Sequence, residues 1–100
     1  MRIRHLVLWK LAAEDADTRA LHAEQIAERL LTLPPLISEI QHLEVGSNVA
    51  FPATNWDVAL VAEFADVEAL ELYQVHPAHV EAAQFVRTLV AERATVDYPF

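Results

Sequence analysis

The chain of 100 residues is 54% hydrophobic and carries 15 acidic against 7 basic side chains, a formal net charge of −8. This length predicts a single domain over residues 1–100, and an apolar content above the globular average of about 45–50% excludes disorder. The absence of cysteine excludes disulfides, thiol catalysis and cysteine metal sites. The acidic balance argues against nucleic-acid and membrane partners, which need a basic surface, and with no signal peptide or membrane-spanning run we expect a cytoplasmic protein.

The first half of the chain predicts two strands separated by a helix. Residues 2–10 form a short run that contains branched and aromatic side chains, as is typical of a β-strand. The acids of 14–17 favour a helix N-terminus, and apolar residues at helical spacing continue this helix to Leu33, where Pro34 follows and ends it. Residues 40–45 are predicted as the second strand, which ends at a Gly-Ser-Asn turn signal.

The second half begins with a loop over 47–55 and then predicts a strand, a helix in two pieces and a last strand, over 56–64, 66–73, 77–90 and 94–98. Asp66 is a natural N-cap for the first helical piece. His76 precedes Pro77, and a proline both disfavours a helical residue before it and suits the first turn of a new helix.

The element order is β-α-β-β-α-β, which predicts an α+β ferredoxin-like fold with a four-stranded antiparallel sheet and helices on one face. The opposite sheet face should then alternate with polar residues, yet Leu6 and Leu8 occupy it in the first strand. We therefore expect a homodimer whose open sheet faces pack together. A monomer with an apolar ligand groove on that face is the alternative, and the two are compatible.

The segment His76-Pro77-Ala78-His79 is the local cluster with chemical potential. If Pro77 begins a helix, both rings lie near unpaired backbone N–H groups, so the pair could supply a general base beside a weak oxyanion site. Alternatively, His76 is a helix cap and His79 a solvated first-turn residue. An H-x-x-H pair without a third ligand predicts no metal site.

Other candidates are spread along the chain. His5 lies mid-strand on the side of Trp9, where a lone histidine is usually a hydrogen-bonded core residue. Tyr73 could pack in the core at the end of a short helix, and Asp97 could orient a histidine or face solvent. We predict His76, Trp9 and Trp56 as substrate-binding residues.

Four segments resemble the stress-responsive α/β-barrel (Dabb) family: R-H-L-V-L-W-K at the start, W-D-V-A-L-V-A-E-F, Y-Q-V-H-P-A-H-V, and the closing V-D-Y. The resemblance covers essentially the whole chain and implies a ferredoxin-like chain that pairs into a dimeric α/β barrel. Within the family it extends distantly to plant polyketide cyclases of the olivetolic acid cyclase type, which perform an aldol condensation.

That resemblance implies His79 as the catalytic histidine and predicts Tyr73, His5 and Asp97, which stand at the matching positions, as further catalytic residues. The chain lacks the cyclase tyrosine of the first long helix and the histidine of the third strand, so the polyketide substrate is not carried over.

Three functional hypotheses follow. The first is a small-molecule pocket with cofactor-independent proton-transfer chemistry, of cyclase, isomerase or lyase type, on a small apolar carbonyl compound. The second is a non-enzymatic, stress-associated homodimer. The third, from fold analogy alone, is a monooxygenase-like member of the dimeric α/β-barrel superfamily.

Overall fold

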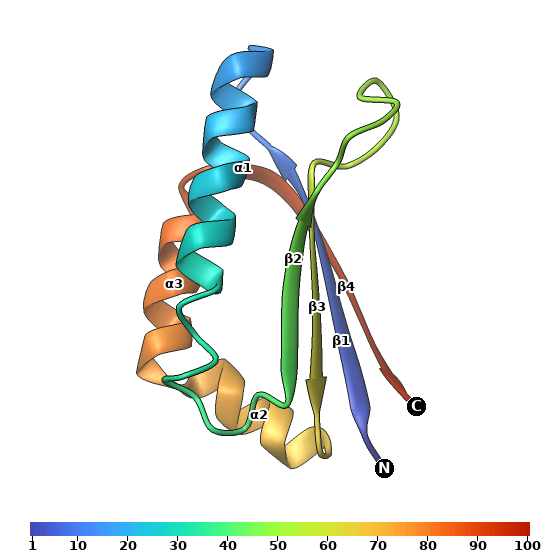
Figure 1. The fold of residues 1–100 in the computed structure, drawn as a ribbon, viewed down its shortest axis with the longest axis vertical. Helices are drawn as coiled ribbons and strands as arrows, with labels where there is room; N and C mark the ends of the chain where they lie inside the picture. Colours follow the sequence, from blue (N-terminus) through green and yellow to red (C-terminus); the bar gives the residue numbers. More distant parts are fainter.

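A computed structural model describes all 100 residues. The elements in chain order are β1 (Ile3–Leu11), α1 (Ala16–Leu30), β2 (His42–Ser47), β3 (Val58–Phe64), α2 (Val67–Val75), α3 (Pro77–Arg87) and β4 (Val90–Pro99). The four strands form one sheet in the order β2-β3-β1-β4 with every neighbouring pair antiparallel. The three helices lie together on one side of this sheet (Figure 1). The predicted ferredoxin-like α+β fold is confirmed.

Side-chain caps fix where two helices begin. The Asp15 carboxylate accepts a hydrogen bond of 2.7 Å from the backbone N–H of Thr18, at the start of α1. The Asp66 carboxylate accepts one of 2.8 Å from Ala69 at the start of α2. Both bonds satisfy N–H groups that have no partner within their helix, so these acids set the helix starts as the sequence predicts.

Helix ends differ from the prediction. α1 ends at Leu30 rather than Leu33, because Leu31 already caps the helix and the chain continues in turns. Leu33 is nevertheless only 1% exposed, so its apolar spacing reflects core packing beyond the helix. α3 likewise ends at Arg87 rather than residue 90, and Val80, placed on the apolar stripe by its spacing, is 40% exposed.

The strand starts also differ. β1 begins at Ile3 rather than residue 2, and β2 at His42 rather than residue 40. β3 begins at Val58, so Trp56 belongs to the preceding loop rather than to the strand. β4 begins at Val90 instead of residue 94, because its pairing with β1 continues beyond Arg93, which lies opposite Trp9. The pairing passes through a register shift at the end of β1. The longer β4 brings Arg93 into the sheet.

The core lies between the sheet and the helices. It contains alternate side chains of β1 and β3, such as Val7 and Leu60, packed against Ile26 of α1. Among the 18 buried residues, His5 is the one polar or charged side chain. A single imidazole in an otherwise apolar core needs polar partners, because burying an unpaired polar group is costly.

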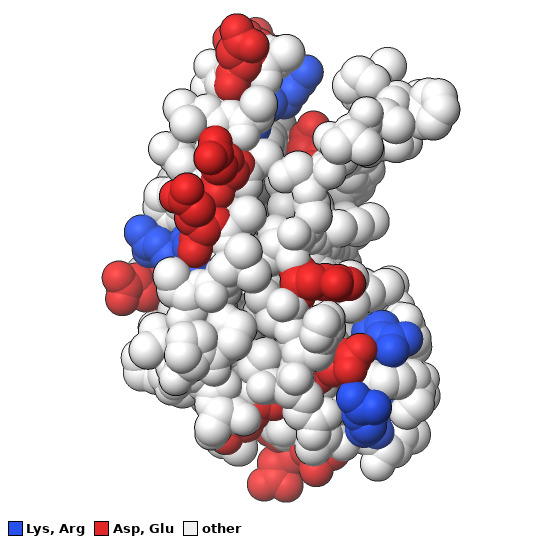
Figure 2. Space-filling model, viewed as in Figure 1, with Lys and Arg blue, Asp and Glu red and all other residues white.

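The opposite sheet face has no helix on it (Figure 1). Leu8 of β1 and Val96 of β4 are 43% and 59% exposed there, although an aqueous sheet face usually alternates with polar residues. Acidic side chains gather along α1 and near α2, as Figure 2 shows for one face of the molecule, and by strand register Glu44, Glu63 and Glu92 lie on the open sheet face. No helix is long and apolar enough to cross a membrane.

Candidate functional site

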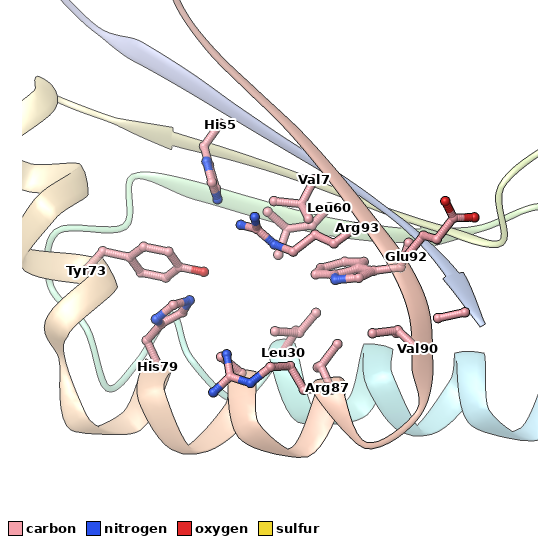
Figure 3. A pocket seen from close by; sticks show the side chains of 14 residues that line it. His5, Val7, Leu30, Leu60, Tyr73, His79, Arg87, Val90, Glu92 and Arg93 are labelled. Carbon is pink, nitrogen blue, oxygen red and sulfur yellow. The ribbon is translucent and has the colours of Figure 1, made fainter. Parts of the chain in front are cut away.

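A pocket of about 480 Å³ opens on the helix side of the sheet, between α3 and β4. Nine of its 14 lining residues are hydrophobic, a tyrosine among them, and the other five are two histidines, two arginines and one glutamate. We call it the α3–β4 pocket; the lining residues used below are His5, Trp9, Tyr73, His79, Arg87 and Arg93 (Figure 3). The α3–β4 pocket lies on the helix side of the sheet, so it is different from the apolar groove that the sequence suggested on the open sheet face.

His79 lies in the first turn of α3, which Pro77 begins. Its Nδ1 is 3.0 Å from the carbonyl oxygen of Gln74. A carbonyl only accepts hydrogen bonds, so Nδ1 carries the proton and Nε2 keeps a lone pair. Burial lowers the pKa of His79 from its ordinary value; the bond to Gln74 opposes this shift, and electrostatic interactions with His5, Arg93 and Arg87 add to it. The ring is therefore a neutral base near pH 7.

Tyr73 comes from the last turn of α2 and is 1% exposed. Its ring centroid lies 4.3 Å from that of His79, with the planes inclined at 46°. Burial raises the pKa of Tyr73 to about 12, against which the charge of Arg93 acts weakly. The phenol thus keeps its proton at neutral pH and can donate a hydrogen bond to a substrate oxygen.

His5 is held from the side by Asp97. The two residues are paired across β1 and β4, and Asp97 Oδ1 accepts a hydrogen bond from His5 Nδ1. This contact leaves His5 Nε2 for the pocket, where the ring centroid is 6.1 Å from that of Tyr73. Asp97 does not line the pocket, so it positions the imidazole rather than touching a ligand.

The structure brings four of the seven predicted site residues into the pocket wall: His5, Trp9, Tyr73 and His79. Asp97 reaches the pocket only through His5. His76 and Trp56 do not line it, so their predicted contact with a substrate in this pocket has no geometric support.

His76 acts as the N-cap of α3, and its Nδ1 accepts a hydrogen bond of 3.1 Å from Ala78. Because Pro77 has no N–H and Ala78 is already bonded, the expected oxyanion site at this helix start lacks its pair of free donors. The helix-cap alternative is the one that the structure supports for this residue. Trp56 lies in the loop before β3, where Lys10 Nζ is 5.3 Å from its ring centroid.

Sequence reasoning missed Arg87 and Arg93. Strand alternation could have found the second one, because residues 93 and 97 share a face when one strand contains both. The predicted strand started at residue 94 and so excluded it. Arg87 stands in the last turn of α3, a common place for a basic residue, and nothing local marks it as a pocket residue.

No group of three or more His, Asp or Glu side chains is placed to hold a metal ion. In particular, His76 and His79 point to different partners, one to the N–H of Ala78 and the other to the carbonyl of Gln74. The polar groups that line the α3–β4 pocket are its imidazoles, phenol, guanidinium groups and the Glu92 carboxylate.

The model of the Dabb family, described as the stress responsive A/B barrel domain, matches residues 3–100. A dimeric protein of unknown function and ferredoxin-like fold from Bacteroides fragilis is 33% identical, with 99% of this chain and 96% of that chain covered and a TM-score of 0.89. A dimeric ferredoxin-like protein of unknown function from Thermobifida fusca is 29% identical, with 100% and 92% covered and a TM-score of 0.84.

Hydroxynitrile lyase from Passiflora edulis is 16% identical, with 97% of this chain and 91% of that chain covered and a TM-score of 0.79, a likeness that shows the fold alone. None of the curated proteins matches the sequence. Because the family model covers nearly the whole chain, this protein belongs to the stress responsive A/B barrel domain (Dabb) family.

Proposed function

We propose that the protein is an enzyme that moves a proton at the carbon next to a carbonyl group, without a cofactor, in the α3–β4 pocket. The observation that carries this proposal is the meeting of a neutral imidazole base and a protonated phenol, His79 and Tyr73, with ring centroids 4.3 Å apart in a largely apolar pocket. A base and an acid held together at neutral pH are what such a proton transfer requires.

In the proposed step, His79 Nε2 takes a proton from the carbon next to the carbonyl. The C–H electron pair forms a C=C bond, and the carbonyl electrons move to oxygen, where the Tyr73 hydroxyl stabilises the enolate by a hydrogen bond. The protonated His79 then returns the proton, either to the same carbon or to a conjugated position of the enolate. In an aldol-type closure the enolate carbon instead attacks a second carbonyl, and His79 protonates the alkoxide that this attack forms. His5 donates its Nδ1–H to Asp97, so its Nε2 accepts a hydrogen bond from a substrate hydroxyl. Loss of CO₂ from a β-keto acid forms the same enolate.

Proton abstraction is testable before the natural substrate is known. We expect the wild-type protein to exchange the acidic carbon-bound protons of the apolar ketone benzylacetone for deuterium in D₂O, followed by proton NMR. His79→Gln should reduce the protein-dependent rate by about 10²- to 10⁴-fold, the usual contribution of a general base. His42→Gln is the matched control, because His42 is exposed on β2 and lies outside the pocket. Equal rates in wild type and His79→Gln would refute the assignment.

The non-enzymatic hypothesis predicts an interior packed solid around His5 and His79. A pocket of about 480 Å³ reached by both residues favours the enzymatic hypothesis instead. A likeness in fold to a hydroxynitrile lyase is consistent with lyase chemistry on this scaffold, although fold alone does not carry an activity.

We also propose that the protein is a homodimer that packs its open sheet faces together. Leu8 and Val96, which are 43% and 59% exposed, belong to that face, and Leu6 and Val61 lie beside them in the register of the sheet. The proteins from Bacteroides fragilis and Thermobifida fusca are both described as dimeric. Burial of this apolar face against a second copy explains why so small and so acidic a chain is 54% hydrophobic.

A further inference from the structure

We infer that the α3–β4 pocket takes a carbonyl compound that also carries a carboxylate, and that Arg87 and Arg93 bind this carboxylate. The inference rests on the proposed function and adds the substrate class to it. It is carried by two guanidinium groups that have no partner within the protein and that reach the same pocket from opposite walls.

The other basic side chains all have partners. Arg2 and Arg4 pair with Glu63 at 2.8 and 3.2 Å, and Lys10 with Glu92 at 3.5 Å. Arg19 donates to the carbonyl of Glu14, and Arg29 lies over the Phe85 ring. Arg87 and Arg93 complete the 7 basic residues, and neither takes part in a hydrogen bond or an ion pair, although the chain has 15 acids.

The two arginines come from opposite walls of the pocket. Arg93 projects from β4 on the helix side of the sheet, opposite Trp9, and Arg87 projects from the last turn of α3. Figure 3 shows both side chains extending toward the end of the pocket that holds Tyr73 and His79. Both charges also lower the pKa of His79, which places them within electrostatic reach of the imidazole.

The helix macrodipole explains only one of them. A basic residue in the last turn stabilises a helix through its macrodipole, which accounts for Arg87. Arg93 stands in the edge strand β4, where no such interaction exists; both side chains are exposed, so water satisfies their charges when the pocket is empty. Glu92 is the one carboxylate in the pocket wall, and it pairs with Lys10 and turns away from both guanidinium groups (Figure 3).

The chemistry of the walls selects the ligand. Guanidinium groups bind carboxylates through paired hydrogen bonds, and two of them on facing walls can hold one carboxylate between them. The rest of the wall is mainly hydrophobic and suits an apolar body. The pocket therefore suits an apolar keto acid, which would place its carbonyl at Tyr73 and its carboxylate at the two arginines.

The test compares 3-benzoylpropionate, an aryl ketone with a carboxylate, with its neutral amide. Trp9 lines the pocket, and the chain has 2 tryptophans, so Trp56→Phe leaves Trp9 as the only tryptophan, whose fluorescence quenching reports binding. We expect the carboxylate to bind about tenfold more tightly than the amide at low salt, as charge-assisted hydrogen bonds provide, and less selectively at high salt. Arg87→Gln combined with Arg93→Gln should reduce the ratio to about one, while Arg19→Gln, the matched control, preserves it.

Equal binding of the carboxylate and the amide to wild type, no binding of either, or a preference that survives in the double variant would each overturn the inference. The benzylacetone exchange tests the proposed function independently of the carboxylate site, because that ketone has no charge. Exchange that depends on His79 while the two probes bind alike rejects only the carboxylate site. A carboxylate preference that depends on the arginines, without exchange by His79, rejects only the proton-transfer chemistry.

Discussion

Tyr73 gives the sharpest quantitative test of the pocket, since its phenol must stay protonated to act as a hydrogen-bond donor. Burial raises its pKa to about 12, whereas a tyrosine in the unfolded chain titrates at about 10. Between these values the unfolded chain loses the proton and the folded one keeps it, so raising the pH favours unfolding. This linkage reduces the free energy of unfolding by about 1.4 kcal/mol at pH 11 and by at most about 2.7 kcal/mol at higher pH.

Tyr73→Phe removes this titration and leaves the other groups in place. We expect wild type to lose about 1.4 kcal/mol more of its free energy of unfolding than Tyr73→Phe between about pH 9 and about pH 11, measured by urea denaturation followed by circular dichroism. The ultraviolet absorbance of tyrosinate gives a second readout. The chain has 2 tyrosines, so subtracting the variant's titration from that of wild type leaves the curve of Tyr73.

Equal losses of stability in the two proteins would refute the reasoning. So would a Tyr73 absorbance transition near pH 10 while circular dichroism shows that the protein is still folded. Either result would mean that water reaches the phenol in the folded state, and the argument that Tyr73 is a desolvated, protonated donor would fail with it.

Three further predictions concern the rest of the site and the dimer. Folding lowers the pKa of His79, so below about pH 6.5 the unfolded chain binds more protons than the folded one. The free energy of unfolding, measured by urea denaturation, should therefore fall more in wild type than in His79→Gln between about pH 7.5 and about pH 5.5. Asp97→Ala leaves the buried His5 Nδ1–H without its acceptor and should cost about 1–3 kcal/mol of unfolding free energy; an unchanged urea midpoint would contradict this. Leu8→Glu combined with Val96→Glu should give a monomer in sedimentation velocity while circular dichroism stays native, whereas a dimer that persists would exclude the open face as the interface.

Features that depend on a few neighbouring residues were predictable from the sequence. The caps formed by Asp15 and Asp66, and the break at His76, each rest on one side chain and the backbone within three residues of it. The order of strands and helices followed from hydrophobic period, since alternation and helical spacing are both local patterns. These features were sufficient for the fold class, because a β-α-β-β-α-β order with short connections leaves few arrangements.

Features that depend on pairing between distant segments were not predictable. The start of β4 is set by its register with β1 and by the shift beside Lys10, not by the composition of residues 90–93. The same pairing places Arg93 in the pocket. Trp56 fits the alternation of β3, but the loop takes it out of the strand and against Lys10. In each case tertiary contacts overrode a local pattern.

The hydrogen bonding of the pocket residues distinguishes a site from a polar core. His5 and His79 each bond a protein oxygen through Nδ1, and neither Nε2 has a partner within the protein. The one fully buried polar side-chain atom without a partner is Nδ1 of His22, on α1, so the free nitrogens of the two pocket histidines reach the open space. Imidazoles held only for packing would be expected to bond through both nitrogens or to be replaced by apolar residues of the same size. Each ring is instead fixed on one side and free on the other, as a ring that accepts a proton or a hydrogen bond from a ligand must be.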